Sequence, residues 1–246
     1  MAKMSLAVLE SALRERKLDR TLSSAAPLAI QDGAYTPTTI PAIDSCLKGG
    51  LPRGQLCELT GPQGAGRTTL ALQLMAGVTS QGEIAAFIDT CDRLDVASAR
   101  AAGIDFDRLL WVRGYSTAQA DRANGALSAL ERAIKALNLV LQAGGFSVVA
   151  IDLIDVPLPV LKRLPLTTWM RLQRAVEGSE TTCLLLASAP LARSAGGVTV
   201  ALSGEPHWSG SGRSQRFTGL SVAARMQSPR RYANGDATFG ALAVDA

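Results

Sequence analysis

The sequence predicts an α/β fold in which helices cover both faces of a mostly parallel sheet. Short apolar segments alternate with segments of helical periodicity along most of the 246-residue chain. The apolar segments are continuous, which is typical of strands that are buried on both faces. A glycine-rich loop also lies between the strand predicted at residues 55–61 and the helix that follows it. Strand, glycine loop and helix in this order indicate a phosphate-binding core.

The predicted elements follow one another in regular alternation. Strands are expected at residues 55–61, 83–90, 109–114, 146–155 and 182–189. Helices are expected at residues 68–82, 92–104, 127–141 and 166–179. Two further strands, at 197–203 and 219–227, flank a glycine- and serine-rich loop at 204–219. We expect these last two strands to form an antiparallel extension at the edge of the sheet.

Composition excludes several classes of protein. Hydrophobic residues make up 47% of the chain and charged residues 19%, which allows a sizeable core and excludes bulk disorder. The 4 cysteines show no C-x-x-C spacing and there is 1 histidine, which argues against a zinc site or a disulfide framework. No stretch approaches the roughly 18 apolar residues of a membrane span. We therefore expect a soluble, cytoplasmic protein.

Three parts are predicted along the chain. They are an N-terminal amphipathic helix with a linker at 1–36, the core at 37–228, and a flexible tail at 229–246. The helix is expected at residues 5–22, where leucines recur near helical spacing. It packs either on its own core or on a neighbouring molecule, and self-association is one such arrangement. In the tail, Phe239, Leu242 and Val244 form a candidate docking motif.

The stretch GPQGAGRTTL, residues 61–70, matches the phosphate-loop pattern G-x-x-x-x-G-K-[ST] at every position but one. Its glycines let backbone N–H groups turn inward around phosphates, and the following helix adds its positive end. The alternative is a glycine-rich turn that binds nothing. The residues expected to bind a nucleotide are Gly61, Gly64, Gly66, Arg67, Thr68 and Thr69.

Arg67 is the departure from this pattern, because it stands where the pattern has lysine. Its guanidinium keeps the positive charge but is longer, planar and forked. Thr68 matches the hydroxyl that holds Mg²⁺.

Acidic residues close two of the predicted strands. Asp152 ends the apolar run VVAID and is the expected second ligand of Mg²⁺, with a helix cap as the alternative. Asp89 ends the run AAFID. Asp89 either orients an attacking water or holds the turn, and the sequence leaves both roles open.

Basic and aromatic residues gather near the C-terminal end of the core. The net charge is +4, and residues 206–231 contain five arginines and no acid. This fits contact with single-stranded DNA, in which arginines neutralise phosphates and aromatic rings stack on bases. The alternative is a solvated basic loop. The candidate DNA-binding residues are Trp208, Arg213, Arg216 and Phe217.

Over residues 37–228 the chain resembles the RecA recombinase family. The resemblance rests on the phosphate loop, on AAFIDTCDRLDVASARAAGIDFDRLLWVRG, on VVAIDLIDV and on TCLLLASAPL. It implies a RecA-like phosphate-loop core, ATP and Mg²⁺ as cofactors, and Asp95 as the acid beside adenine.

Several positions depart from the family's pattern. The catalytic glutamate falls on Cys91, the tyrosine that stacks on adenine falls on Ser98, and the γ-phosphate sensors fall on Ser188 and Ala189. Together with Arg67, these changes imply weak or absent ATP hydrolysis. The alternative is an active DNA-dependent ATPase in which Asp89 or Asp92 replaces the glutamate.

This combination is similar to the short RecA-like ImuA group of bacterial SOS mutagenesis cassettes. That resemblance implies an accessory role in translesion synthesis and the DNA damage response. The implied partners are an inactive Y-family-like polymerase homologue and an error-prone polymerase, with a recombinase filament as a further candidate. A non-catalytic docking module remains a second interpretation.

Overall fold

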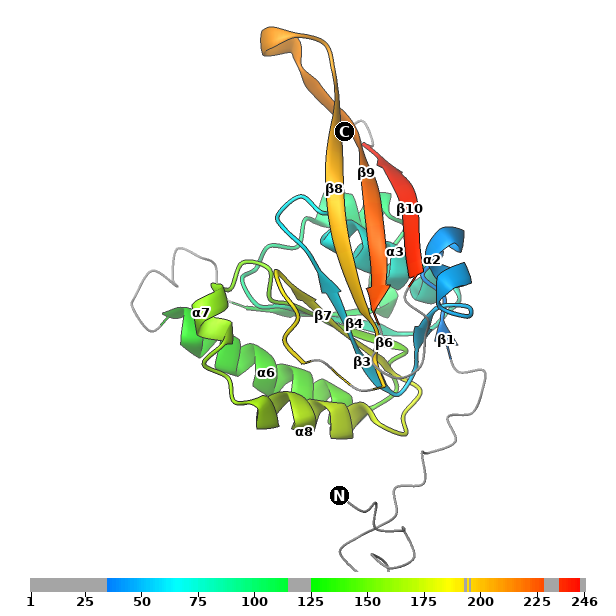
Figure 1. Ribbon diagram of the computed structural model, residues 1–246. Coiled ribbons are helices and arrows are strands. Elements are labelled where there is room, and N and C mark those ends of the chain that lie inside the picture. The colour runs from blue at the N-terminus through cyan, green and yellow to red at the C-terminus, as the bar shows by residue number, and fades with distance from the viewer. Residues whose placement is uncertain (1–34, 115–124, 193, 195, 228–234, 244–246) are drawn as a thin grey trace, which may run out of the picture. The chain divides into compact units, whose positions relative to one another are not determined.

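A central sheet organises the described part of the chain (Figure 1). The computed structural model describes residues 35–114, 125–192, 194, 196–227 and 235–243. Among these residues the sheet has eight strands in the order β10-β9-β8-β3-β7-β6-β4-β5. Its strands are β3 (Gln55–Thr60), β4 (Ala85–Asp89), β5 (Leu109–Arg113), β6 (Val148–Asp152), β7 (Thr182–Ala187), β8 (Thr199–Ser209), β9 (Arg216–Gln227) and β10 (Gly235–Leu242). The predicted α/β fold class is confirmed.

The interior of the sheet is parallel. Strands β3, β7, β6, β4 and β5 all run in the same direction. Every residue of β3 and β7 is buried, as the continuous apolar runs predict for strands covered on both faces. The edge extension differs from the prediction in one respect, because β8 pairs parallel with β3, while β9 is antiparallel to both of its neighbours, β8 and β10.

Helices form one layer on each face of the sheet. One apolar cluster joins the sheet to α2 (Pro41–Cys46), α3 (Arg67–Ser80) and α4 (Val96–Ala101). The other cluster joins it to α6 (Gly125–Ala143), α7 (Leu158–Leu161) and α8 (Leu166–Val176). Leu130, Leu137 and Leu141 of α6 are buried, as their spacing predicts. Short 3₁₀ turns occur at Phe106–Arg108 and Gly212–Ser214.

The hairpin of β8 and β9 is longer than the sequence predicts. Residues 204–219 were expected to form a loop, but the two strands pair from Thr199↔Gln227 to Ser209↔Arg216. The prediction was wrong because cross-strand hydrogen bonds stabilise extended backbone even where glycine and serine lower the intrinsic β preference. In Figure 1 the hairpin projects well beyond the other strands.

The chain after β9 also corrects a prediction. Residues 235–242 were assigned to a flexible tail, yet they form β10, which pairs with β9 along its length. Ala237 is buried and Phe239 packs on the core, while Leu242 is exposed. Val244 and the predicted helix at 5–22 lie outside the described residues, so the three-part division of the chain stays a prediction.

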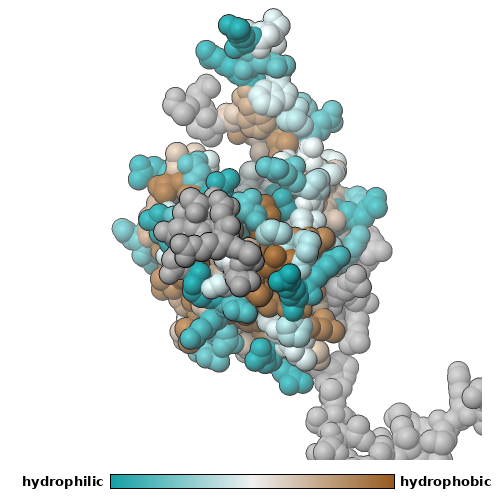
Figure 2. Space-filling model, turned by 90° about the vertical axis from the view of Figure 1, so that its left-hand side faces the viewer, coloured by the Kyte–Doolittle hydropathy of each residue, from teal (hydrophilic) through white to brown (hydrophobic). Residues whose placement is uncertain are grey.

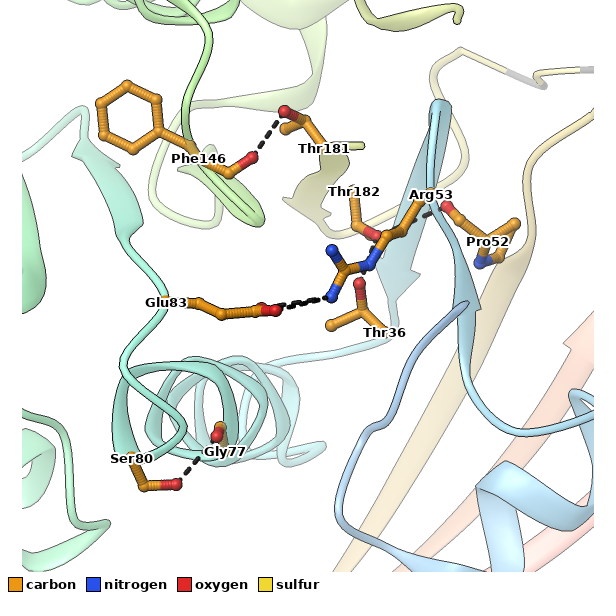
Figure 3. A network of polar contacts seen from close by, with 9 residues as sticks. All are labelled: Thr36, Pro52, Arg53, Gly77, Ser80, Glu83, Phe146, Thr181 and Thr182. Atoms are coloured by element: carbon orange, nitrogen blue, oxygen red, sulfur yellow. Dashed lines mark hydrogen bonds and ion pairs between the residues drawn. The ribbon is translucent and has the colours of Figure 1, made fainter. Parts of the chain in front are cut away.

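Polar contacts fasten the amino-terminal edge of the sheet (Figure 3). The small sheet of β1 (Tyr35–Thr36) and β2 (Leu51–Pro52) lies here, although residues 35 and 36 were expected in the linker. The Thr36 and Thr182 hydroxyl oxygens are 2.8 Å apart. The Arg53 guanidinium bonds to Glu83, just before β4, at 3.1 Å. These contacts tie β1, β2, β4 and β7 together.

At the carboxyl ends of the parallel strands, β8 lies directly against the glycine loop. A Cβ added to Gly204 would lie 2.5 Å from the carbonyl oxygen of Gly64. A Cβ added to Gly61 would lie 2.2 Å from the carbonyl oxygen of Leu202. The loop and the hairpin therefore approach at backbone distance, which only glycine permits.

We predict that Gly204→Ala lowers the free energy of unfolding by about 1–3 kcal/mol, because the new methyl group meets backbone atoms that cannot move aside. Urea denaturation measures this change. Gly240→Ala on β10 is the matched control, since its added Cβ has nothing within 4 Å. The control should shift stability by less than about 0.5 kcal/mol. Equal losses in the two variants would contradict the assigned contact.

Candidate functional site

The carboxyl ends of the parallel strands meet at one edge of the sheet. The glycine loop follows β3, Asp152 ends β6, and Asp89 ends β4. Asp89 and Asp152 are register partners on adjacent strands. Parallel α/β sheets bind ligands at this edge, so the predicted residues share the position at which a site is expected.

The glycine loop has the conformation of an anion cradle. Gly66 is the N-cap of α3 with a left-handed φ of 85°, and no side chain caps this helix. Gly64, with a φ of 76°, also adopts a conformation that favours glycine. The first amides of a helix have no intrahelical acceptor, so those of α3 are donors for an anion. Thr68 and Thr69 are exposed at the same helix end.

Arg67 carries a donor that the described residues do not satisfy. Its side chain is buried, and its Nη1 has no hydrogen-bond partner among them. Burial lowers the pKa of Arg67, while the carboxylates of Asp152 and Asp155 raise it. Because arginine stays protonated in proteins, this is a buried cation with an unused N–H group. Such a group is costly unless paired, and a phosphate oxygen would satisfy it.

Asp152 is half-buried at the carboxyl end of β6. Burial raises its pKa to about 6, while the hydrogen bond from the Ile154 amide to Oδ1, at 2.9 Å, acts to lower it. No group of three or more His, Cys, Asp or Glu suited to a metal ion occurs among the described residues. Magnesium is commonly held by one or two carboxylates together with substrate phosphates. Asp152 and Thr68 fit that limited protein contribution.

Asp89 holds the turn that follows β4. Its oxygens accept hydrogen bonds from the amides of Arg93 and Leu94, both at 2.8 Å, and from Nε1 of Trp111 at 3.2 Å. The carboxylate is buried. Of the two roles left open for Asp89, these contacts support the structural one.

Neither neighbouring side chain offers a free carboxylate to the site. Asp92 bonds twice to the guanidinium of Arg113, at 2.8 and 2.9 Å, and Arg113 stacks on the Trp111 ring. Cys91 is half-buried, and burial, followed by the charges of nearby aspartates, raises its pKa to about 11. The Cys91 thiol is therefore protonated at neutral pH and is a poor base.

Asp95 acts as a helix cap. Its carboxylate accepts hydrogen bonds from the Ser98 amide, at 2.9 Å, and from the Ser98 hydroxyl. The helix α4 that it caps is shorter than the helix predicted at 92–104. The reason is that Asp89 binds two of the amides that a longer helix would use, and Asp92 has a φ of 56°. On β7's carboxyl side, Ser188 is exposed and Ala189 is half-buried.

A pocket of about 440 Å³ lies over the glycine loop. Residues 63–69 line one side, and Ile154, Gly204, Pro206, Phe217 and Leu220 line the other. Its volume is within the range of small-molecule sites. No local sequence pattern indicates Pro206 or Leu220, because they reach the pocket only through the packing of the hairpin against the loop.

The candidate DNA-binding residues are brought together on the hairpin. Trp208 and Phe217 are cross-strand partners whose ring centroids are 5.5 Å apart in an edge-to-face arrangement. Arg213 and Arg216 are exposed at and next to its tip. Figure 2 shows the projecting end with hydrophilic residues at its tip and hydrophobic residues nearer its base.

The fold and the loop define an α/β protein of the phosphate-loop class. The family model for the RecA N-terminal domain matches residues 29–159, which is more than half of the chain. The chain therefore belongs to the RecA family. None of the helices in the described part of the chain is both long and apolar enough to cross a membrane.

Curated relatives agree with this assignment. Protein RecA of Bifidobacterium breve is 35% identical over 131 residues, which are 53% of this chain and 30% of that protein. Protein RecA of Salinispora tropica is 34% identical over 131 residues, or 53% and 34% of the two chains. Protein RecA of Synechocystis is 37% identical over 106 residues, or 43% and 27%. The match spans about a third of the length of these relatives.

The pKa of Asp152 predicts a pH-dependent stability in buffer free of divalent cations. A carboxyl whose pKa is raised in the folded state holds its proton more tightly there than in the unfolded chain. Its contribution therefore becomes unfavourable as pH rises from about 4 to 6 and stays so above 6. We expect Asp152→Asn to raise the free energy of unfolding at pH 7.5 by up to about 3 kcal/mol, with little change at pH 4.

Asp92→Asn is the control of opposite sign. The hydrogen bond from Arg113 lowers the pKa of Asp92, so this carboxylate stabilises the fold above its usual pKa and the variant should lose stability at pH 7.5. Denaturation curves at several pH values measure both variants. A destabilised Asp152→Asn at pH 7.5 would contradict the effect assigned to its burial.

Proposed function

We propose that this chain is a RecA-like accessory protein of the DNA damage response that binds a nucleotide but hydrolyses it weakly or not at all. One observation carries this conclusion. The loop that would hold phosphates has a buried cation, Arg67, whose Nη1 has no hydrogen-bond partner among the described residues, while the carboxylates of Asp89 and Asp92 are occupied by structural contacts.

ATP and Mg²⁺ are the proposed cofactors. The amides of residues 64–69 and the Arg67 guanidinium would hold the phosphates, and Thr68 with Asp152 would hold the metal ion. The bound metal would neutralise charge on the phosphates. Asp95 was expected to contact adenine, but its bonds to Ser98 support a capping role instead.

Weak or absent ATP hydrolysis is supported by the residues that would lie beside the attacking water. Cys91 stands where the family has its glutamate, and its thiol is protonated at neutral pH. Asp89 and Asp92 were the candidate replacements, and both are held by other donors. A missing general base commonly lowers a rate by about 10²–10⁴.

The resemblance to the ImuA group suggests the process. We propose that the chain supports error-prone translesion synthesis under the SOS response, beside an inactive Y-family-like polymerase homologue and an error-prone polymerase. Filament contacts and self-association are proposed from its RecA relatives. The exposed hairpin of β8 and β9 and the segment at 1–36 are the surfaces we propose for these contacts.

The first test is nucleotide binding and phosphate release with single-stranded DNA present. We expect Mg²⁺-dependent binding of ATP without turnover above background, because Asp89 and Asp92, the candidate replacements for the glutamate, are bonded to other groups. Arg67→Ala should abolish binding, since it removes the buried cation. Absence of binding by the unaltered chain would contradict nucleotide-dependent action and leave the docking-module interpretation.

The alternative, an active DNA-dependent ATPase, has its own signature. If phosphate release occurs, Thr68→Ala and Asp152→Ala should each abolish it, because both would hold Mg²⁺. Turnover that is unchanged in these variants would contradict this alternative.

For DNA contact we predict that Arg213→Ala combined with Arg216→Ala weakens binding to single-stranded DNA and flattens its salt dependence by about two charges. Fluorescence anisotropy at several salt concentrations measures both quantities. The matched control is Arg171→Ala with Arg174→Ala, two exposed arginines of α8. An equal effect of both double variants would indicate general basicity, and no effect of the hairpin variant would exclude this loop.

A further inference from the structure

The pocket over the glycine loop has two chemically different sides. On one side are the loop amides, Arg67 and the two threonines. On the other is an apolar surface formed by Pro206, Phe217 and Leu220 of β8 and β9, which we call the hairpin wall. The three hairpin-wall side chains have no hydrogen-bonding group. A ligand that fills this pocket would therefore combine an anionic end with an apolar, flat end.

The hairpin wall is held in place before any ligand binds. Leu220 is buried, and Pro206 is its register partner on β8. The Phe217 ring contacts the Trp208 ring edge-to-face at 5.5 Å. Below the wall, Gly204 touches the backbone of Gly64. Because these contacts fix the distance between loop and wall, the cost of ordering the site on binding is small.

The other candidate location for the nucleobase has no aromatic ring on which the nucleobase could stack. Resemblance to the family places adenine beside residues 95 and 98, on α4. Here residue 98 is serine, which has no ring to stack on a base. The Asp95 carboxylate is bonded to the amide and hydroxyl of that same serine. Stacking area is therefore available at the hairpin wall and not at α4.

We propose that a purine nucleoside triphosphate binds with its phosphates on the glycine loop and its base packed on the hairpin wall, mainly on the ring of Phe217. This rests on the proposed function, because it requires that a nucleotide binds. Since the hairpin wall contacts the face of a base and has no side chain to read its edge, ATP and GTP bind with similar affinity. CTP binds less tightly because its ring is smaller.

In this arrangement the hairpin of β8 and β9 forms part of the nucleotide site, because the nucleobase packs on it. Phe217 would contact the base on one side and already contacts Trp208 on the other, so the base would add a contact to a pair of rings that is in place before binding. The tip that carries Arg213 follows directly on these two residues in the hairpin. A bound nucleotide would thus contact the same two strands that carry the basic tip.

The test is calorimetric titration of the full chain with ATP, GTP, CTP and inorganic tripolyphosphate. Stacking of a base on an aromatic side chain contributes about 1–3 kcal/mol, so Phe217→Ala should weaken ATP and GTP binding about 5- to 150-fold. Tripolyphosphate, which has no base, should bind the variant within about twofold of the unaltered chain. Phe217→Tyr, which keeps the ring, should restore ATP affinity.

Leu110→Ala on β5 is the matched control, because Leu110 is a partly exposed apolar residue at the opposite edge of the sheet. It should leave every affinity unchanged. Urea denaturation checks that each variant is folded. If Phe217→Ala does not fold, Phe217→Leu replaces it, because leucine keeps the apolar volume without a ring.

The outcomes separate this inference from the proposed function. Unchanged ATP affinity in Phe217→Ala, or an equal loss for tripolyphosphate, overturns the base site and leaves nucleotide binding intact. A strong preference for ATP over GTP also overturns it, since the hairpin wall cannot distinguish them. If the unaltered chain binds neither ATP nor tripolyphosphate, both the base site and nucleotide-dependent function are wrong.

Discussion

The backbone contact between the glycine loop and β8 is the constraint on which the rest of the site depends. Gly61 lies against the Leu202 carbonyl and Gly204 against that of Gly64, at distances that no side chain would allow. This contact sets the loop at the foot of a long hairpin and closes one side of the pocket. A phosphate loop needs glycine for its inward-turned amides, and here glycine also permits the second strand to approach.

The charged residues around the loop fall into two groups with different contacts. Asp89 is bonded by two amides of the turn that follows it, and Asp92 is bonded by Arg113 of β5, so these contacts stabilise the fold. Arg67 is the opposite case, because it is buried and its Nη1 has no bond among the described residues. A RecA-family chain with these features is suited to holding an anion and poorly suited to activating water.

The hairpin joins two properties that are separate in the sequence. The part of the hairpin nearest the sheet contributes apolar surface to the pocket, and the tip of the hairpin presents exposed arginines to solvent. Phe217 belongs to the apolar surface and contacts Trp208 on the other strand. Any ligand in the pocket and any partner at the tip would therefore act on the same two strands, which is a physical route for coupling the two events.

The sequence by itself determined the α/β class, the parallel strands, the helix faces and the glycine loop, because these depend on periodicity and local backbone preference. It also predicts Thr68 and Asp152 near the carboxyl ends of buried strands. The predictions of a loop at 204–219 and a flexible tail at 235–242 were wrong, because pairing with neighbouring strands makes these residues extended. Only the tertiary structure decided that Asp89 holds a turn and that Pro206, Phe217 and Leu220 face the loop, since such contacts join residues far apart in the chain.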